Sequence, residues 1–218
     1  MHSENTVKDN SEKTAIIVLI IIYVVGLIGF TFKIHPDFAR LTPVNMILSL
    51  VFVLYHHKNW NGRMVFFCFF CFLFGFIIEM IGVQTGQIFG QYQYDYALGL
   101  KFRNTPLSIG VNWLVVAYCS AMVVNAAVSK NSHWLFKSTL AAALMVSFDV
   151  LIEPIAMKTG MWSWQDNVVP MQNYFGWFAT ALPLQILFYN LIEPTTNKVA
   201  VALLILQFSF FLILSFLL

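Results

Sequence analysis

The sequence predicts an all-α integral membrane protein, a polytopic bundle of about seven transmembrane helices within a range of about six to eight. Of the 218 residues, 59% are apolar and only 10% are charged, whereas a soluble domain carries about 25% charged residues. The apolar residues gather in seven long runs separated by polar segments. Because a helix needs roughly 20 mostly apolar residues to cross a bilayer, these runs account for most of the chain.

The predicted spans follow the apolar runs in order. They are 14–32, 41–55, 64–83, 106–128, 135–157, 174–192 and 199–218. Backbone polar groups in lipid must be satisfied internally, and the aromatic residues do not alternate with polar ones as in a membrane barrel, so we expect helices. The run 41–55 is the shortest and predicts a tilted or interfacial helix. We therefore expect a polar N-terminal tail, 1–13, followed by one transmembrane domain, 14–218.

The positive charges give a prediction of orientation. With seven spans, the N-terminal side holds Lys8, Lys13, Lys58, Arg63, Lys130, Lys137 and Lys198, and the opposite side holds Lys33, Arg40, Lys101, Arg103 and Lys158. Cytoplasmic segments carry an excess of Lys and Arg. The difference favours a cytoplasmic N-terminus for a multi-pass protein of the cell (inner) membrane.

Several function classes have no support in the sequence. The basic residues form no stripe, so a nucleic-acid partner is not expected. Cys68 and Cys71 have CxxC spacing but lie inside an apolar run, which favours a packing role over a metal site. The histidines form no cluster of the kind that holds two iron ions, and no glycine-rich phosphate loop or dinucleotide fingerprint is present. We expect neither a metal nor a cofactor.

Three acidic residues lie within the predicted spans, where ionisable side chains are rare and usually functional. Glu79 lies near the end of the third span, and Asp149 and Glu153 lie in the second half of the fifth. The spacing of four places the last two on one helix face. Odd-numbered spans run in the same direction, so all three acids approach one membrane face and are the candidate catalytic residues. The alternative is that each acid only bonds a neighbouring helix or pairs with Lys158.

Two long loops, Gln84–Thr105 and Lys158–Asn173, lie on that same face by span parity. Gly82, Gly86 and Gly90 recur every four residues. They predict either a smooth strip on a prolonged third helix or a turn that returns the following tyrosines over the acids. The candidate substrate-binding residues are those three glycines with Thr85, Tyr92, Tyr94, Asn112, Trp113, Trp162, Trp164, Asn173 and Trp177. For most of the aromatic residues, the alternative is an interfacial belt.

The motifs around these residues resemble one known family. The stretch from Gly75 to Tyr94 (GFIIEMIGVQTGQIFGQYQY) is similar to the membrane carotenoid-biosynthesis proteins, which include the carotenoid 1′,2′-hydratases of the CruF type and the bisanhydrobacterioruberin hydratases. Three further segments extend the resemblance, namely 106–113, 149–164 and 173–177. The similarity covers roughly residues 64–180, while the N-terminal third and the last helix carry no signature of the family.

This resemblance implies a hydratase that adds water across the terminal C1′–C2′ double bond of an acyclic, lycopene- or γ-carotene-like end group. An acid protonates the alkene and water captures the tertiary cation, without a cofactor. Glu153 or Glu79 is the expected acid, and Asp149 the residue that positions water or stabilises the cation. The expected partners are the carotenoid, water, the lipid bilayer and other carotenoid-pathway enzymes. The alternatives are an end-group cyclase or isomerase, and a non-enzymatic transporter or pigment-binding protein.

Overall fold

The computed structural model describes the backbone of residues 2–218 and the side chains of residues 10–218. The side chains of His2 and Lys8 therefore lie outside the described residues. Seven long helices are present: α1 (His2–Thr31), α2 (Thr42–Tyr55), α3 (Gly62–Thr85), α4 (Ser108–Ala127), α5 (Trp134–Lys158), α6 (Met171–Leu191) and α7 (Lys198–Leu217). The prediction of an all-α bundle is confirmed. Helix α1 begins inside the segment 1–13 that the sequence predicts as a polar tail.

Six of the helices in the described part of the chain are long and apolar enough to cross a membrane. Helix α2 reaches this length together with a short 3-10 helix, η1 (Phe38–Leu41), which precedes it. The remaining long helix, α6, is not among these six. It has 21 residues but contains polar side chains such as Asn173 and Gln185, both of which are buried. It packs along α5, and these two polar side chains face protein rather than lipid.

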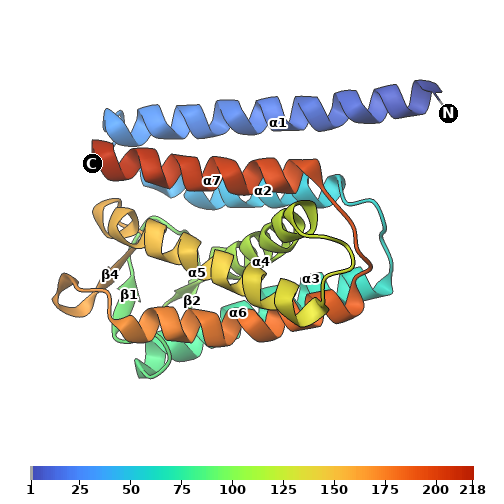
Figure 1. Cartoon of the computed structure of the whole chain (residues 1–218). Helices are drawn as coiled ribbons and strands as arrows, with labels where there is room; N and C mark the ends of the chain where they lie inside the picture. The colour runs from blue at the N-terminus through green and yellow to red at the C-terminus, as the bar shows by residue number, and fades with distance from the viewer. Residues whose placement is uncertain (1) are drawn as a thin grey trace.

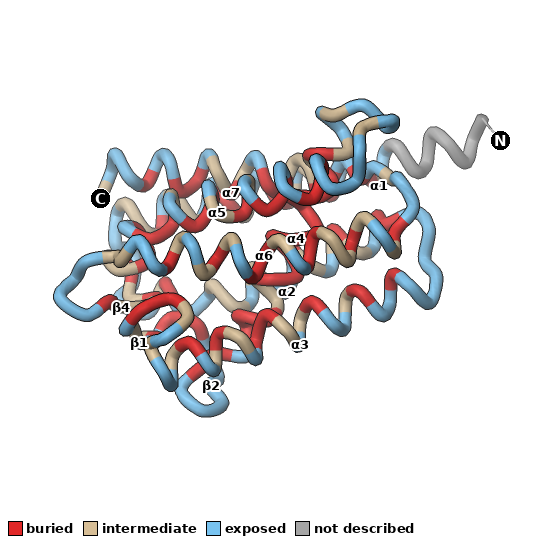
Figure 2. Tube along the Cα trace, turned by 60° about the horizontal axis from the view of Figure 1, so that its bottom comes forward, coloured by how far each residue is buried: buried red, intermediate tan, exposed pale blue. Residues whose placement is uncertain are grey.

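Helix α4 is the centre of the bundle (Figure 1). Its spanning segment is 72% buried, whereas those of α1 and of η1 with α2 are only 22% and 17% buried. Figure 2 shows the outward faces of the helices as exposed, and these faces carry large apolar residues such as Ile17, Phe69 and Phe216. Such a surface fits a lipid environment, because water would not solvate it favourably.

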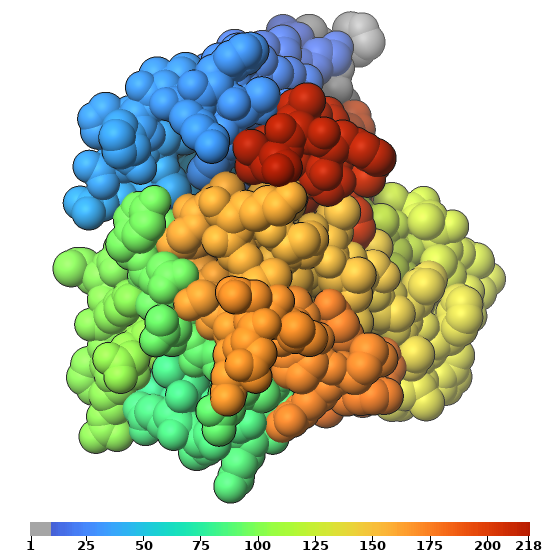
Figure 3. Space-filling model, turned by 90° about the vertical axis from the view of Figure 1, so that its left-hand side faces the viewer, coloured from blue at the N-terminus to red at the C-terminus, as the bar shows by residue number. Residues whose placement is uncertain are grey.

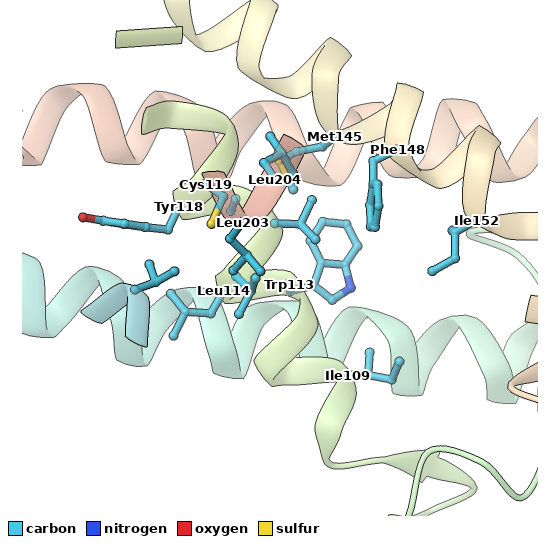
Figure 4. Packing of buried hydrophobic residues seen from close by; sticks show 14 of the residues in the cluster. Ile109, Trp113, Leu114, Tyr118, Cys119, Met145, Phe148, Ile152, Leu203 and Leu204 are labelled. Carbon is cyan, nitrogen blue, oxygen red and sulfur yellow. The ribbon is translucent and has the colours of Figure 1, made fainter. Parts of the chain in front are cut away.

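The buried core forms where α4, α5 and α7 meet. Trp113 and Tyr118 of α4 are fully buried, as are Met145 of α5 and Leu203 of α7. Figure 4 shows these side chains packed together, with Phe148 beside them. This close packing fixes the positions of the helices from which the polar residues described below project.

The two long loops fold over one end of the bundle and pair with each other. Strand β1 (Tyr92–Tyr94) and strand β4 (Trp162–Trp164) form an antiparallel two-stranded sheet. A second small sheet joins β2 (Lys101–Phe102) and β3 (Thr105–Pro106), and a 3-10 helix, η2 (Gln165–Asn167), follows β4. Figure 3 views this end, with the blue N-terminal elements and the red C-terminal helix side by side at the top and the orange and green segments below them.

Candidate functional site

The structure brings the three predicted acids into one small cavity. Glu79 lies six residues before the end of α3, and Asp149 and Glu153 lie on consecutive turns of α5. Each side chain is at most 3% exposed, and all three line a cavity of about 30 Å³ under the β1–β4 sheet. This volume has room for one or two water molecules.

Glu79 accepts three hydrogen bonds from neutral donors. The Tyr92 and Tyr94 hydroxyl groups both donate to Oε2, the latter at 2.8 Å. The indole Nε1–H of Trp113 donates to Oε1 at 3.0 Å. Trp113 is held in place by stacking on Trp177, with ring centroids 4.3 Å apart. A buried carboxyl group is costly unless its oxygens are bonded, and here both oxygens are.

Glu153 and Asp149 share one amide. The indole nitrogens of Trp162 and Trp164 donate to Glu153 Oε2 at 2.8 and 2.6 Å. Asn173 Nδ2 donates to Asp149 Oδ2 at 2.6 Å and to Glu153 Oε1 at 3.3 Å. Glu153 therefore has three donors, and Asp149 has one among the described residues. The two acids form a linked pair on one face of α5.

The register of the β1–β4 sheet explains why the donors converge. Tyr92 lies opposite Trp164 and Tyr94 lies opposite Trp162, so these four side chains share one face of the sheet. Gln93 and Ser163 lie between them, on the other face. Burial raises the pKa of both tyrosines well above its ordinary value, and the neighbouring Glu79 adds to this. Both phenols therefore remain protonated donors at neutral pH.

The glycines shape the turn that brings β1 back over the acids. Helix α3 ends at Thr85, and Gly86 follows in the left-handed conformation (φ +65°), so the turn forms rather than a prolonged helix. Gly90 has a φ of +109°, and a Cβ atom there would lie 2.5 Å from Pro170. A Cβ atom on Gly82 would lie 2.6 Å from Phe89 and 3.3 Å from the Tyr92 hydroxyl oxygen.

Not every predicted residue lies at the cavity. The Thr85 side chain is exposed. Its hydroxyl group donates to the carbonyl oxygen of Ile81 in the last turn of α3, so it bonds the helix and not the acids. Gly86 and Gly90 shape the backbone outside the cavity wall. Lys158, the predicted ion-pair partner, is also exposed. The described partners of the three acids are instead phenol, indole and amide groups.

Two apolar residues in the wall of the acid cavity, and a second cavity beside it, were not predicted from the sequence. Phe89 and Ile109 line the acid cavity but have no polar signal that singles them out. Ile109, Asn112 and Trp162 also line a second cavity of about 80 Å³, mostly apolar, between α1, α2, α4, α5 and α7. The two cavities are thus neighbours with a shared wall. Among the described side chains, no group of three or more His, Cys, Asp or Glu is placed to hold a metal ion.

Comparison with known proteins identifies relatives. A family model described as "Carotenoid biosynthesis protein" matches residues 41–218. The bisanhydrobacterioruberin hydratase of Haloarcula japonica is 30% identical over 125 residues, which are 53% of this chain and 41% of the relative. The match therefore spans about two fifths of that protein's length. No solved structure is significantly similar to the chain.

Proposed function

Because the chain belongs to the carotenoid biosynthesis protein family, we propose that it is a carotenoid hydratase. It adds water across the terminal C1′–C2′ double bond of an acyclic carotenoid end group and yields a tertiary alcohol. One observation carries the proposal: three buried acids, bonded by neutral donors, line a cavity beside a mostly apolar one. The Haloarcula relative is named a hydratase, which also supports hydration.

The proposed proton donor belongs to the Asp149–Glu153 pair. Two buried carboxyl groups that share one amide repel each other when both are ionised, so the pair favours holding one proton. Glu153 already accepts from two indole N–H groups, whereas Asp149 accepts only from Asn173 among the described residues. We therefore assign the proton to Asp149. This assignment differs from the prediction made from the sequence, in which Glu153 or Glu79 is the acid and Asp149 positions water or stabilises the cation.

The remaining acids take the other roles in the proposed reaction. Asp149 transfers its proton to one alkene carbon, and the neighbouring carbon becomes a tertiary cation. Glu79 and Glu153, held as acceptors, stabilise this positive charge across the cavity. Water adds to the cation, and the pair takes up the proton that the water loses, so the proton of Asp149 is restored. The sum is one water added, with no oxidant, reductant or cofactor.

The surroundings suit both reactants. The neighbouring apolar cavity offers a place for the isoprenoid chain next to the acids. On the outer face of the β1–β4 sheet, a polar pocket is lined by Gln91, Gln93, Ser163 and Gln165 together with Tyr92 and Trp164. Tyr92 and Trp164 also line the acid cavity, so they separate it from the outer pocket and are the proposed gate for water.

The proposal also covers the substrate, the partner enzymes and the membrane in which the protein lies. The substrate is an acyclic carotenoid of the lycopene or γ-carotene type, and other carotenoid-pathway enzymes supply it. The six candidate spans support a membrane location. We propose the cell (inner) membrane, with the N-terminus in the cytoplasm, on the charge distribution alone.

Pigment analysis tests the proposal directly. The chain is expressed in a host that accumulates lycopene or γ-carotene, and the pigments are separated by chromatography and identified by mass spectrometry. A more polar product heavier by one water supports hydration. A product of unchanged mass with a cyclised end group shows a cyclase instead. Unchanged pigment in the presence of well-expressed protein contradicts hydration of these substrates.

A further inference from the structure

A groove lies between α5 and α7 on the outer surface of the bundle, away from the cavities described above. It has a volume of about 470 Å³. Helix α5 packs much more closely against α6 than against α7, which leaves this space open. We call it the α5–α7 groove. Its lining includes Ser147, Val150 and Pro154 of α5, and Phe208, Ser209 and Leu212 of α7.

The surface of the α5–α7 groove is hydrophobic. Val150 and Leu212 are each 49% exposed there. The Ser147 hydroxyl group donates to the Ala143 carbonyl oxygen at 2.9 Å, and the Ser215 hydroxyl group, also in the groove, donates to the Leu212 carbonyl oxygen at 2.7 Å. Because these hydroxyl groups are bonded within their own helices, they need no polar ligand. The groove therefore fits a hydrocarbon chain.

The groove runs beside the turns of α5 that carry two of the acids. Val150 follows Asp149 in the sequence, and Pro154 follows Glu153. Consecutive residues of a helix point about 100° apart around its axis, so the acids and the groove occupy different faces of the same two turns. A chain lying in the groove is thus at the depth in the membrane at which the acids lie.

A wall of aromatic rings separates the groove from the larger inner cavity. Phe148 lines that cavity, and its ring packs against that of Phe208, which lines the groove, with centroids 5.4 Å apart. Phe211, which also lines the cavity, packs against Phe148 at 5.6 Å. Figure 4 shows Phe148 projecting from α5 into the core. Phe208 is only partly buried, so its ring is the part of the wall that can turn towards the lipid.

The inner cavities are too small to hold the whole of the proposed substrate. Their volumes of about 30 and 80 Å³ correspond to a few water molecules. An acyclic carotenoid is a long hydrocarbon, so only its end group reaches the acids and the rest of the chain leaves the core. The α5–α7 groove is larger than both inner cavities together and lies directly behind the wall of the larger one.

We propose that the α5–α7 groove binds the polyene chain of the carotenoid while the end group passes Phe208 into the larger cavity and on to the acids. This inference rests on the proposed function. Lipid tails are as apolar as a polyene, so the groove gains little from hydrophobic burial. Its contribution is to hold the chain so that the terminal double bond lies beside the acids. The substrate enters from the bilayer and does not cross the polar loops.

Filling the groove tests the proposal. Ser209→Trp introduces a large side chain from α7, and the full-length protein in lipid nanodiscs is supplied with lycopene. Hydration should fall by about tenfold in kcat/KM, at the lower end of the usual effect of overfilling a formed site. Ser147→Trp fills the groove from α5 and should act in the same way, so it covers the case in which Ser209→Trp does not fold.

Ile213→Trp is the matched control. Ile213 lies one turn further along α7 and is 42% exposed, but it does not line the groove. This variant should hydrate lycopene as the wild type does. Unchanged turnover in both groove variants overturns the proposal and assigns the groove to bilayer lipid. An equal loss in Ile213→Trp overturns it as well, because the loss then does not depend on the groove.

The position of the chain is measured independently of the chemistry. An amino acid with a diazirine side chain replaces Ser209 or Ile213, and irradiation in the presence of lycopene attaches any hydrocarbon that lies beside it. Mass spectrometry should find the lycopene adduct at position 209 and little at position 213. If lycopene is not hydrated, the proposed function fails, but this difference would still support the groove. Equal adducts at the two positions, or an oligomer that Ser209→Trp dissociates without any lycopene adduct at position 209, would overturn it, the latter in favour of a second copy of the chain.

Discussion

Buried acids occur at both ends of the helical bundle, and their partners differ. At the N-terminal end of α1, Glu12 is 5% exposed and forms ion pairs with Lys58 at 3.5 Å and Lys198 at 3.4 Å. At the other end, Glu79, Asp149 and Glu153 are bonded by phenol, indole and amide groups. The two lysine ammonium groups compensate the charge of Glu12, whereas the described partners of the three cavity acids are neutral. Under the proposed function, Glu12 is a structural acid and the other three are the reactive ones.

The other polar groups show the same contrast. Near Glu12, Asn197 accepts from the backbone N–H groups of Val199 and Ala200 at 3.1 Å and so caps α7. Its Nδ2 donates to the Val53 carbonyl oxygen at 2.8 Å, which ties the cap to α2. Asn173 is as deeply buried but bonds two acids instead of a helix end. One end of the bundle uses its polar residues to hold helices, and the other to surround a cavity.

The largest expected effect comes from the acids themselves. Asp149→Asn keeps the shape of the side chain and removes the proposed proton, so hydration should fall by about 10²–10⁴-fold. Glu12→Gln, the matched change at the opposite end, should keep full activity per folded protein. Product formation per amount of folded protein measures both. Equal losses in the two variants would contradict the proposed difference between Asp149 and Glu12.

A smaller loss is expected when one donor to the acids is removed. Trp164→Phe leaves an aromatic ring but removes the N–H group that donates to Glu153 at 2.6 Å. Because hydrogen bonds to charged groups contribute about 1.5–3 kcal/mol, activity should fall by about ten- to a hundredfold. Trp134→Phe is the control, since Trp134 is 41% exposed at the start of α5, far from the cavity. If Trp164→Phe is fully active, the sheet does not orient Glu153.

Two glycine substitutions compare the start of α3 with the loop that follows its other end. Gly90→Ala should lower the free energy of unfolding by about 1–3 kcal/mol, because a positive φ and contact with Pro170 both oppose a side chain. Gly62→Ala, at the start of α3, meets no atom within 4 Å and should be neutral or slightly stabilising. Thermal unfolding in detergent measures both. A Gly90→Ala protein of unchanged stability would mean that the loop accommodates the Cβ atom by moving.

The smallest effect is expected at the α7 cap. Asn197→Ala should lower the free energy of unfolding by about 1–2 kcal/mol, the usual cost of losing such a cap. The activity of the protein that remains folded should not change, because Asn197 lies at the end opposite the acids. Unfolding curves and specific activity, measured on the same preparation, check the two parts. Lower specific activity at unchanged stability would contradict the view that Asn197 only stabilises the helices and does not affect the acid cavity.

The sequence predicted the spans and the acids because each has a local signal. Long apolar runs predict helices wherever they occur, and a carboxyl group such as Glu79 inside one is rare enough to stand out. Span parity then places the acids and both loops at one face. The pairing of β1 with β4 has no such signal, because its strands have three residues each and lie about 70 positions apart in the chain. The donors to each acid could be predicted as a group but not individually.

The polar residues that line the larger cavity were not predicted, for a related reason. Tyr23, Asn45, Ser49 and Gln207 are single neutral residues within apolar runs, and such residues are ordinary in membrane helices. Only the packing of α1 and α7 against α2 brings them into one cavity. Long-range packing of this kind leaves no periodic pattern in one sequence. The positions of Phe89 and Ile109 in the cavity wall depend on it as well.

The most direct test of the central claim follows the oxygen atom of water. The purified protein is incubated with its carotenoid in water enriched in heavy oxygen, and the product is analysed by mass spectrometry, with Asp149→Asn alongside. The proposed reaction predicts one heavy oxygen atom per new hydroxyl group in the wild-type product and little product from the variant. A product without heavy oxygen, or equal labelling by Asp149→Asn, would contradict acid-catalysed hydration at this cavity.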